Sequence, residues 1–180
     1  SQGDVFLPQK IVSQIAFMDK LELYDAVLYS DYAQIDDSGR PVGDKRLPNP
    51  LPDSFFQYIY LNPEIHSGTL LIPKMAFVEA GVFSERLNAT YDYDLWMRMC
   101  RRRSFVHQAE ILVQKRSCEM RDTGMKPEHG PESRAFFERY LPELLEVVSA
   151  EKTPDEAKRQ RLSLVPQLFA QGHGDIVKRF

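Results

Sequence analysis

Cysteines are few in this sequence, and it has no long apolar segment. Cys100 and Cys118 are the only cysteines among 180 residues, too few for a disulfide framework. No apolar run approaches the roughly 20 residues that a membrane-spanning helix needs. The first ten residues, which include Asp4, Pro8 and Lys10, have no apolar core of a secretory signal. These absences predict a reduced, cytoplasmic protein, or the cytoplasmic part of a larger one.

The sequence also has no excess of positive charge and no cluster of metal-ligand residues. The net charge is -3, which gives no general attraction to nucleic acid or to anionic membranes. The one basic run, Arg101–Arg103, falls at the expected end of a helix, where it would complement the helix dipole. We therefore expect a solvated helix end and no nucleic-acid partner. No metal site is predicted, because the four histidines lack ligand-like spacing: His66, His107, His129 and His173.

The chain does contain strands and helices in alternation, and it is long enough to bury one sizeable core. Pro8 suits the first position of a helix. The apolar residues of that helix recur at three- and four-residue spacing as one face: Ile11, Val12, Ile15 and Met18. Residues 26–32, AVLYSDY, predict a buried strand, and residues 35–40 predict the turn that follows it.

Prolines interrupt the middle of the sequence. Four of them lie between residues 41 and 52, which predicts a loop that serves either recognition or plain connection. A short aromatic helix is expected over 54–60, a strand over 69–72, and a helix over 74–80 that ends at Gly81.

A further helix is expected over 92–102, with acidic residues at its start and arginines at its end. Leu95, Met99 and Trp96 would lie on its inner face. The segment 105–115 predicts two short strands around Glu110.

The last fifty residues show helical patterns only. Residues 131–150 show helical periodicity, and Thr153 begins a capping box with proline at the first helical position. Pro166 should break or kink that second helix, and Gly172 and Gly174 should end it. We therefore divide the chain into a domain over 1–130 and a helical tail over 131–180, which packs on the edge of the domain or mediates association.

Several short sequence segments resemble those of a known protein family and occur in the same order. SGTLLIPK, AFVEAGVFSERL and YDYDLWMR resemble the C-terminal half of family 2 glycosyltransferases, which carry a small-residue turn before a strand and an E-D-x-D-L-W phrase. DVFLPQK at the N-terminus resembles the segment that follows their metal-binding D-x-D motif. The resemblance covers about residues 4–116. It implies an α/β fold, the acceptor-side half of a GT-A-type domain with a mixed sheet and flanking helices, plus the helical tail.

This resemblance also implies roles for individual residues. An inverting sugar transfer needs a base for the acceptor hydroxyl, and Asp92 matches the aspartate of the E-D motif. The alternative is that Asp92 is only an N-terminal carboxylate that offsets a helix dipole. Asp94 and Trp96 match the following D-L-W and are expected to be structural or to position the acceptor. Ser67, Gly68 and Thr69 match the turn that lines the acceptor side, and His66 is a further candidate because it lies beside that turn.

Cofactor and partners follow from the same resemblance. The intact enzyme would use Mn²⁺ or Mg²⁺, held by ligands that are not in this chain. Its donor would be a nucleotide-diphospho-sugar, and its acceptor a glycan or lipid-linked molecule of polysaccharide biosynthesis. The enzyme would act at the inner face of a membrane. The chain would start inside a larger domain and be inactive in isolation. Half a domain should also expose a sheet edge, which predicts a homodimer or another edge-protecting contact.

The sequence departs from the family pattern at specific positions. Tyr91 stands in place of the glutamate of E-D, and Cys118 stands where many members have histidine. Ser1 and Gly3 stand where the D-x-D carboxylates would be. A catalytically degenerate carbohydrate-binding or scaffolding domain therefore remains an alternative, and a nucleic-acid-binding module would rest on Arg101–Arg103 alone.

Overall fold

A computed structural model describes residues 3–62, 64–116, 130–150, 152–170 and 174. The expectations for Ser1, Cys118, His129, Gly172 and His173 therefore lie outside the described residues.

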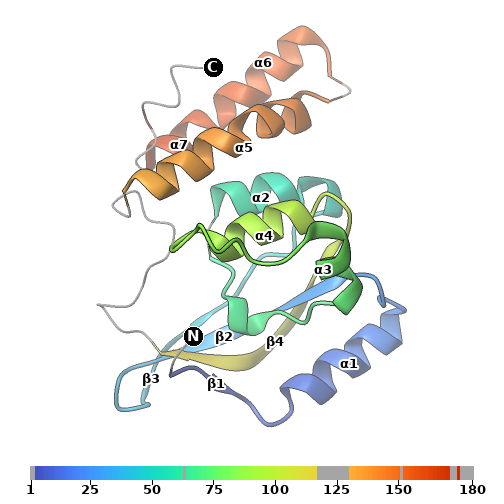
Figure 1. The fold of residues 1–180 in the computed structure, drawn as a ribbon, viewed down its shortest axis with the longest axis vertical. Helices are drawn as coiled ribbons and strands as arrows, with labels where there is room; N and C mark the ends of the chain where they lie inside the picture. The colour runs from blue at the N-terminus through green and yellow to red at the C-terminus, as the bar shows by residue number, and fades with distance from the viewer. Residues whose placement is uncertain (1–2, 63, 117–129, 151, 171–173, 175–180) are drawn as a thin grey trace.

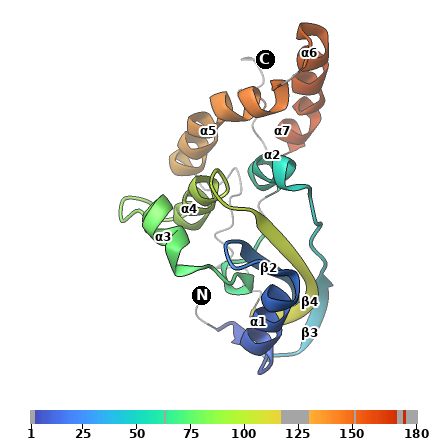
Figure 2. The ribbon, with the colours of Figure 1, turned by 90° about the vertical axis from the view of Figure 1, so that its right-hand side faces the viewer.

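The sheet is sandwiched between one helix on one face and several helices on the other (Figure 1). Helix α1 (Lys10–Leu21) covers one face. Helices α2 (Phe55–Leu61) and α4 (Tyr91–Met99) cover the other, with α3 (Lys74–Ala80) beside α4. A third layer lies on α2 and α4 (Figure 2) and is formed by α5 (Pro131–Ser149), α6 (Pro154–Ser163) and α7 (Val165–Ala170).

Four strands form a mixed sheet in the order β1-β4-β2-β3. The central pair, β2 (Val27–Ile35) and β4 (Phe105–Arg116), is parallel. The edge strands β1 (Val5–Phe6) and β3 (Pro41–Lys45) are antiparallel to their neighbours. Most of β2 is buried, as expected for a strand with both faces covered. The predicted α/β class and mixed sheet are confirmed.

Three predicted elements differ from the structure. The expected loop over 41–52 begins with β3, because Pro41 is the first residue of an edge strand and its missing N–H is not needed there. The expected strand over 69–72 is reduced to a single bridge between Leu71 and Leu28. The two strands expected around Glu110 are one strand, β4, in which register shifts opposite Ser30–Tyr32 absorb the irregularity.

Helix α1 buries polar side chains and exposes its apolar face. Ile11, Val12 and Ile15 are exposed, whereas Lys10 and Gln14 are buried. Lys10 Nζ donates to Gln14 Oε1 at 2.6 Å and to the Leu70 carbonyl at 3.3 Å, and Gln14 Nε2 donates to the Thr69 carbonyl at 3.0 Å. The periodicity identified the helix, but not which of its sides faces the protein.

We predict opposite stability effects on the two sides of α1. Gln14→Leu should lower the free energy of unfolding by about 1–3 kcal/mol, because it leaves the buried Thr69 carbonyl without its donor. Val12→Gln, on the exposed side, should change it by less than about 0.5 kcal/mol. Urea denaturation of both variants is the measurement. A larger loss for Val12→Gln than for Gln14→Leu would show that the apolar face is covered in solution.

One long strand edge is left open. On the side away from β2, strand β4 pairs with β1 only through Val113 and Gln114, so residues 105–111 have no second strand partner among the described residues. The outer edge strand β3 carries Pro41, Asp44 and Lys45, which discourage edge-to-edge pairing. A stretch of edge without a strand partner is thus present among the described residues, and the dimer it predicts remains a prediction.

The other local predictions are largely confirmed. Gly81 ends α3 with φ 79°, a region that favours glycine. The capping box at Thr153 is formed, and the helix it starts is broken between Ser163 and Val165, just before Pro166. Helix α4 begins at Tyr91 and ends at Met99, earlier than expected, and a turn follows it. Within the part of the chain that the structure describes, no helix is both long and apolar enough to cross a membrane.

Candidate functional site

The carboxyl ends of the two parallel strands meet at one group of polar residues. Ligands of open α/β sheets usually bind at this end. Here Asp4 Oδ1 accepts from the Arg116 amide at 3.1 Å, and Asp4 Oδ2 lies 2.7 Å from His66 Nε2. The Arg116 guanidinium in turn donates to the carbonyls of Asp36 and Asp37, just after β2.

The predicted acceptor turn is a short 3₁₀ helix, Ser67–Thr69, directly after His66. Thr69 is fully buried and its hydroxyl donates to the His66 carbonyl at 2.7 Å, whereas Ser67 is exposed. Gly68 lies under the imidazole, because a Cβ built on it would be 3.3 Å from His66 Nε2. The close approach of ring and backbone explains the glycine at this position.

His66 is held in one orientation. Its ring packs against Tyr32 with centroids 5.8 Å apart, and burial lowers its pKa although Asp4 opposes the shift. A neutral ring that donates from Nε2 to Asp4 keeps Nδ1 as an acceptor, as the hydrogen-bond pattern implies.

The start of α4 is tied to this turn. The Tyr93 hydroxyl donates to the Ile65 carbonyl at 3.0 Å, one residue before His66. Tyr93 is buried, and its ring packs on Trp96 with centroids 4.7 Å apart. The structure thus links the first turn of the helix that carries Asp92 to the segment that carries the acceptor turn.

Asp92 is half-buried at the beginning of α4. Its carboxylate accepts from the Tyr93 amide at 2.9 Å, and burial raises its pKa above the ordinary 3.8. A carboxylate whose main role is to offset the helix dipole would have a lowered pKa. In Asp92 desolvation outweighs the backbone hydrogen bonds and raises the pKa, and a raised pKa makes a carboxylate a candidate for a functional role.

A second carboxylate, Glu132 of α5, binds the residues directly before α4. It accepts from the amides of Asn88, Ala89 and Thr90 at 3.0, 2.9 and 2.8 Å, and from the Thr90 hydroxyl at 2.9 Å. Burial opposes ionisation, but these donors outweigh it and hold the pKa of Glu132 below its usual value. Two carboxylates therefore share the start of α4, and their pKa values are shifted in opposite directions.

Asp94 and Trp96 point into the protein. Asp94 is 3% exposed and accepts from Arg98 Nε at 3.0 Å, Arg139 Nη1 at 2.9 Å and the Tyr140 hydroxyl at 2.8 Å. Trp96 is 1% exposed within the core. Both positions join α4 to the rest of the fold, and their part in acceptor positioning remains a prediction.

Sequence reasoning missed a buried cluster around Asp31 of β2. Its carboxylate accepts from the Leu47 amide at 2.8 Å and Arg46 Nη1 at 3.0 Å, and it lies 2.7 Å from His107 Nε2. These contacts anchor the proline-rich segment after β3. A single acid inside the apolar strand AVLYSDY was the signal that could have found it, because a buried charge needs partners.

The arginines around the end of α4 are mostly paired. Arg98 donates to the carbonyls of Ala80 and Val82, and Arg101 pairs with Glu143.

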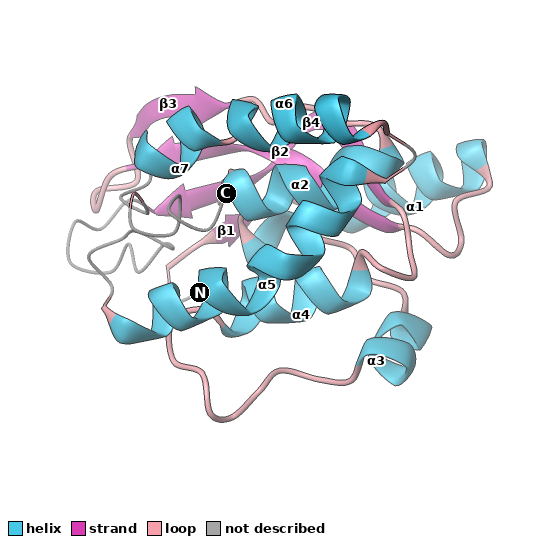
Figure 3. Ribbon diagram, turned by 90° about the horizontal axis from the view of Figure 1, so that it is seen from above, coloured by secondary structure: helices cyan, strands magenta, loops and turns pink. Residues whose placement is uncertain are grey.

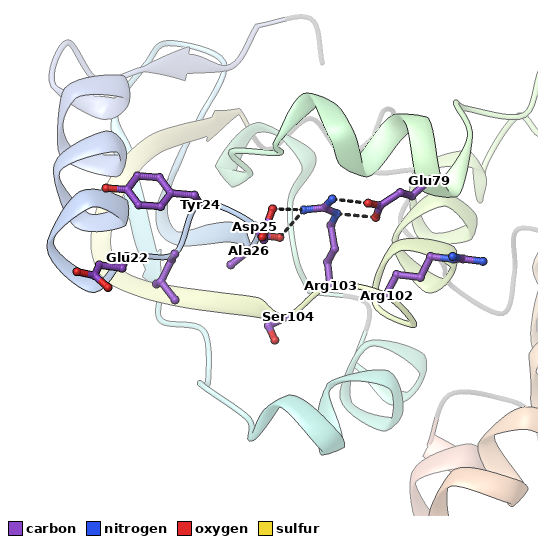
Figure 4. A pocket seen from close by; sticks show the side chains of 9 residues that line it. Glu22, Tyr24, Asp25, Ala26, Glu79, Arg102, Arg103 and Ser104 are labelled. Carbon is purple, nitrogen blue, oxygen red and sulfur yellow. Dashed lines mark hydrogen bonds and ion pairs between the residues drawn. The ribbon is translucent and has the colours of Figure 1, made fainter.

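Arg103 lies beside a cavity at the opposite, amino ends of β2 and β4 (Figure 4), where it pairs with Glu79 at 2.6 Å and Asp25 at 3.2 Å. The cavity is about 540 Å³, and its polar lining also includes Glu22, Tyr24 and Arg102. Among the described residues, no group of three His, Cys, Asp or Glu side chains is arranged to hold a metal ion.

The curated proteins to which this chain is similar are named uncharacterized glycosyltransferases. The chain is 32% identical over 164 residues to a protein of Rickettsia felis named uncharacterized glycosyltransferase, an alignment that covers 86% of this chain and 26% of the relative. A protein of Rickettsia typhi with the same description is 32% identical over 149 residues, covering 80% of this chain and 46% of the relative. One from Rickettsia prowazekii is 36% identical over 121 residues, covering 64% and 37%.

The chain thus spans between about a quarter and just under half of the length of these relatives. No protein-family model matches it. The similarity extends over most of this chain and supports a relationship to glycosyltransferases.

Proposed function

We propose that the chain is the acceptor-side part of an inverting family 2 glycosyltransferase of the GT-A type. It would transfer a sugar from a nucleotide-diphospho-sugar to a hydroxyl of a glycan or lipid-linked acceptor, at the cytoplasmic side of a membrane. The observation that carries the proposal is the division of roles at the start of α4. Glu132 binds the amides directly before α4, and Asp92 in the first turn of α4 is desolvated and has a raised pKa. Its neighbour Tyr93 binds the Ile65 carbonyl, close to the acceptor turn.

In the proposed reaction Asp92 is the base. Its ionised carboxylate takes the proton of the acceptor hydroxyl as that oxygen bonds to the anomeric carbon, and the bond to the diphosphate breaks with its electron pair on the leaving oxygen. A raised pKa brings the base closer to the acidity of the hydroxyl in the transition state. His66 Nδ1 and the exposed Ser67 would orient acceptor hydroxyls.

The intact enzyme would need positive charge on the leaving diphosphate. A divalent metal, when bound, supplies that charge. The described residues offer no ligand set for it, so none of the steps assigned to them involves the metal. The metal ligands and donor site would belong to the longer polypeptide.

The test is a turnover assay on the longer polypeptide that we propose contains this chain. Release of nucleoside diphosphate is measured with a panel of UDP-, GDP- and dTDP-sugars, with and without glycan acceptors. Acceptor-dependent release that requires Asp92 supports the proposal.

A catalytically degenerate carbohydrate-binding domain is the second candidate. Tyr91 favours it, because this residue replaces the motif's glutamate and is 42% exposed at the start of α4. Saturable binding of an acceptor glycan without release of nucleoside diphosphate, for every donor in the panel, would select this candidate.

We also propose self-association through the open edge of β4, which would cover residues 105–111. Analytical ultracentrifugation of the chain tests it, and a monomer at every concentration would contradict it.

A further inference from the structure

We infer that the helical tail belongs to the catalytic unit, with Glu132 acting as a positioning residue for Asp92. This inference rests on the proposed function, since it assigns a role to Glu132 through Asp92.

The geometry concerns the three residues before α4. Glu132 Oε1 accepts from Ala89 and Thr90 amides and from the Thr90 hydroxyl, and both of its oxygens face the Asn88 amide. Thr90 is fully buried and is the N-cap residue directly before α4. One side chain from α5 therefore fixes three consecutive amides, two residues before Asp92.

The rest of α5 reinforces this attachment. It runs over α2 and α4 (Figure 3), and Arg139 and Tyr140 bind Asp94 one helical turn further along. The Tyr60 hydroxyl of α2 donates to the Phe137 carbonyl at 2.9 Å. The loop over residues 82–90 contains no helix or strand of its own, so Glu132 supplies the order that regular hydrogen bonding would give.

Displacing a catalytic group by about 1 Å can cost on the order of 10²-fold in rate. Loss of Glu132 frees the backbone directly before Asp92, whereas the acceptor turn keeps the bonds from Lys10 and Gln14 at the Leu70 and Thr69 carbonyls. The inference therefore predicts a fall in kcat with KM nearly unchanged.

The experiment compares Glu132→Ala, Glu132→Gln and the control Glu143→Ala in the longer polypeptide. Glu143 also lies on α5 and also joins the tail to the domain, but through Arg101 at the other end of α4. We expect Glu132→Ala to lower kcat by about 10-fold or more with KM within about 2-fold. Glu132→Gln keeps one acceptor oxygen and should retain kcat within about 3-fold, and Glu143→Ala should leave it unchanged.

Two outcomes overturn the inference while leaving the proposed function intact. One is a normal kcat in Glu132→Ala when Asp92→Asn is inactive. The other is an equal loss in Glu132→Ala and Glu143→Ala, which would indicate general undocking of the tail.

If Glu132→Ala fails to fold, Thr90→Val removes only the hydroxyl bond. It should then lower kcat several-fold, and an unchanged kcat would overturn the inference. Normal turnover in Asp92→Asn would instead remove the proposed function.

Discussion

Asp92→Asn should lower sugar-transfer turnover by roughly 10²-fold or more while leaving the fold at least as stable as the wild type. Asparagine keeps the size of the side chain and its bond to the Tyr93 amide, but it cannot take a proton. Turnover and thermal midpoint of the two proteins are the measurements. The matched control is Asp155→Asn, an exposed acid in the first turn of α6, which should change neither.

The stability effect of this substitution has a defined pH dependence. Burial raises the pKa of Asp92 in the folded state above the ordinary 3.8. The favourable contribution of the protonated group is therefore fully present below pH 3.8 and is lost as pH rises through the folded pKa. Asp92→Asn should thus gain stability relative to the wild type as pH rises through that value. A constant difference between the two proteins, or normal turnover in the variant, would contradict the assignment.

Asp94→Ala should lower the free energy of unfolding by about 2–3 kcal/mol. It removes a 3%-exposed carboxylate that binds Arg98, Arg139 and Tyr140. The loss should be smaller than for a fully buried pair, because the Arg139 side chain is 61% exposed and partly screened. Urea denaturation at neutral pH measures it, and a loss below about 0.5 kcal/mol would be inconsistent with the buried network.

Arg139→Ala is the control for this prediction. It removes only the exposed partner and should cost less than about 1 kcal/mol. If Asp94 acts only structurally, Asp94→Asn should change turnover only as far as it lowers the folded fraction. A raised acceptor KM in fully folded Asp94→Asn would instead assign Asp94 to acceptor positioning.

Local sequence signals predicted most of the elements because each of these signals acts within a few residues. The capping box at Thr153 and the glycine end of α3 are of this kind, and both are present in the structure. The pattern in α1 did not predict which side is buried, because that depends on the carbonyls of Thr69 and Leu70, about 55 to 60 residues away.

The same limit applies to the site. The family phrases placed Asp92 and the turn Ser67–Thr69 among the candidates, and the structure links their neighbours through Tyr93. Glu132 could not be found this way, because its partners, Asn88 to Thr90, lie more than 40 residues away and no local pattern joins them. Such long-range contacts become visible only in the folded structure, where α5 lies on α4.

The most direct measurement of the central claim is a carboxyl ¹³C NMR titration of Asp92 and Glu132 in the 180-residue chain. The account predicts that Asp92 titrates above 3.8 because it is desolvated, and that Glu132 titrates below 4.5 because it accepts from the amides before α4. Asp92→Asn and Glu132→Gln assign the two signals. An Asp92 carboxyl that titrates at or below 3.8 would show a helix-stabilising residue, and would contradict its assignment as the base.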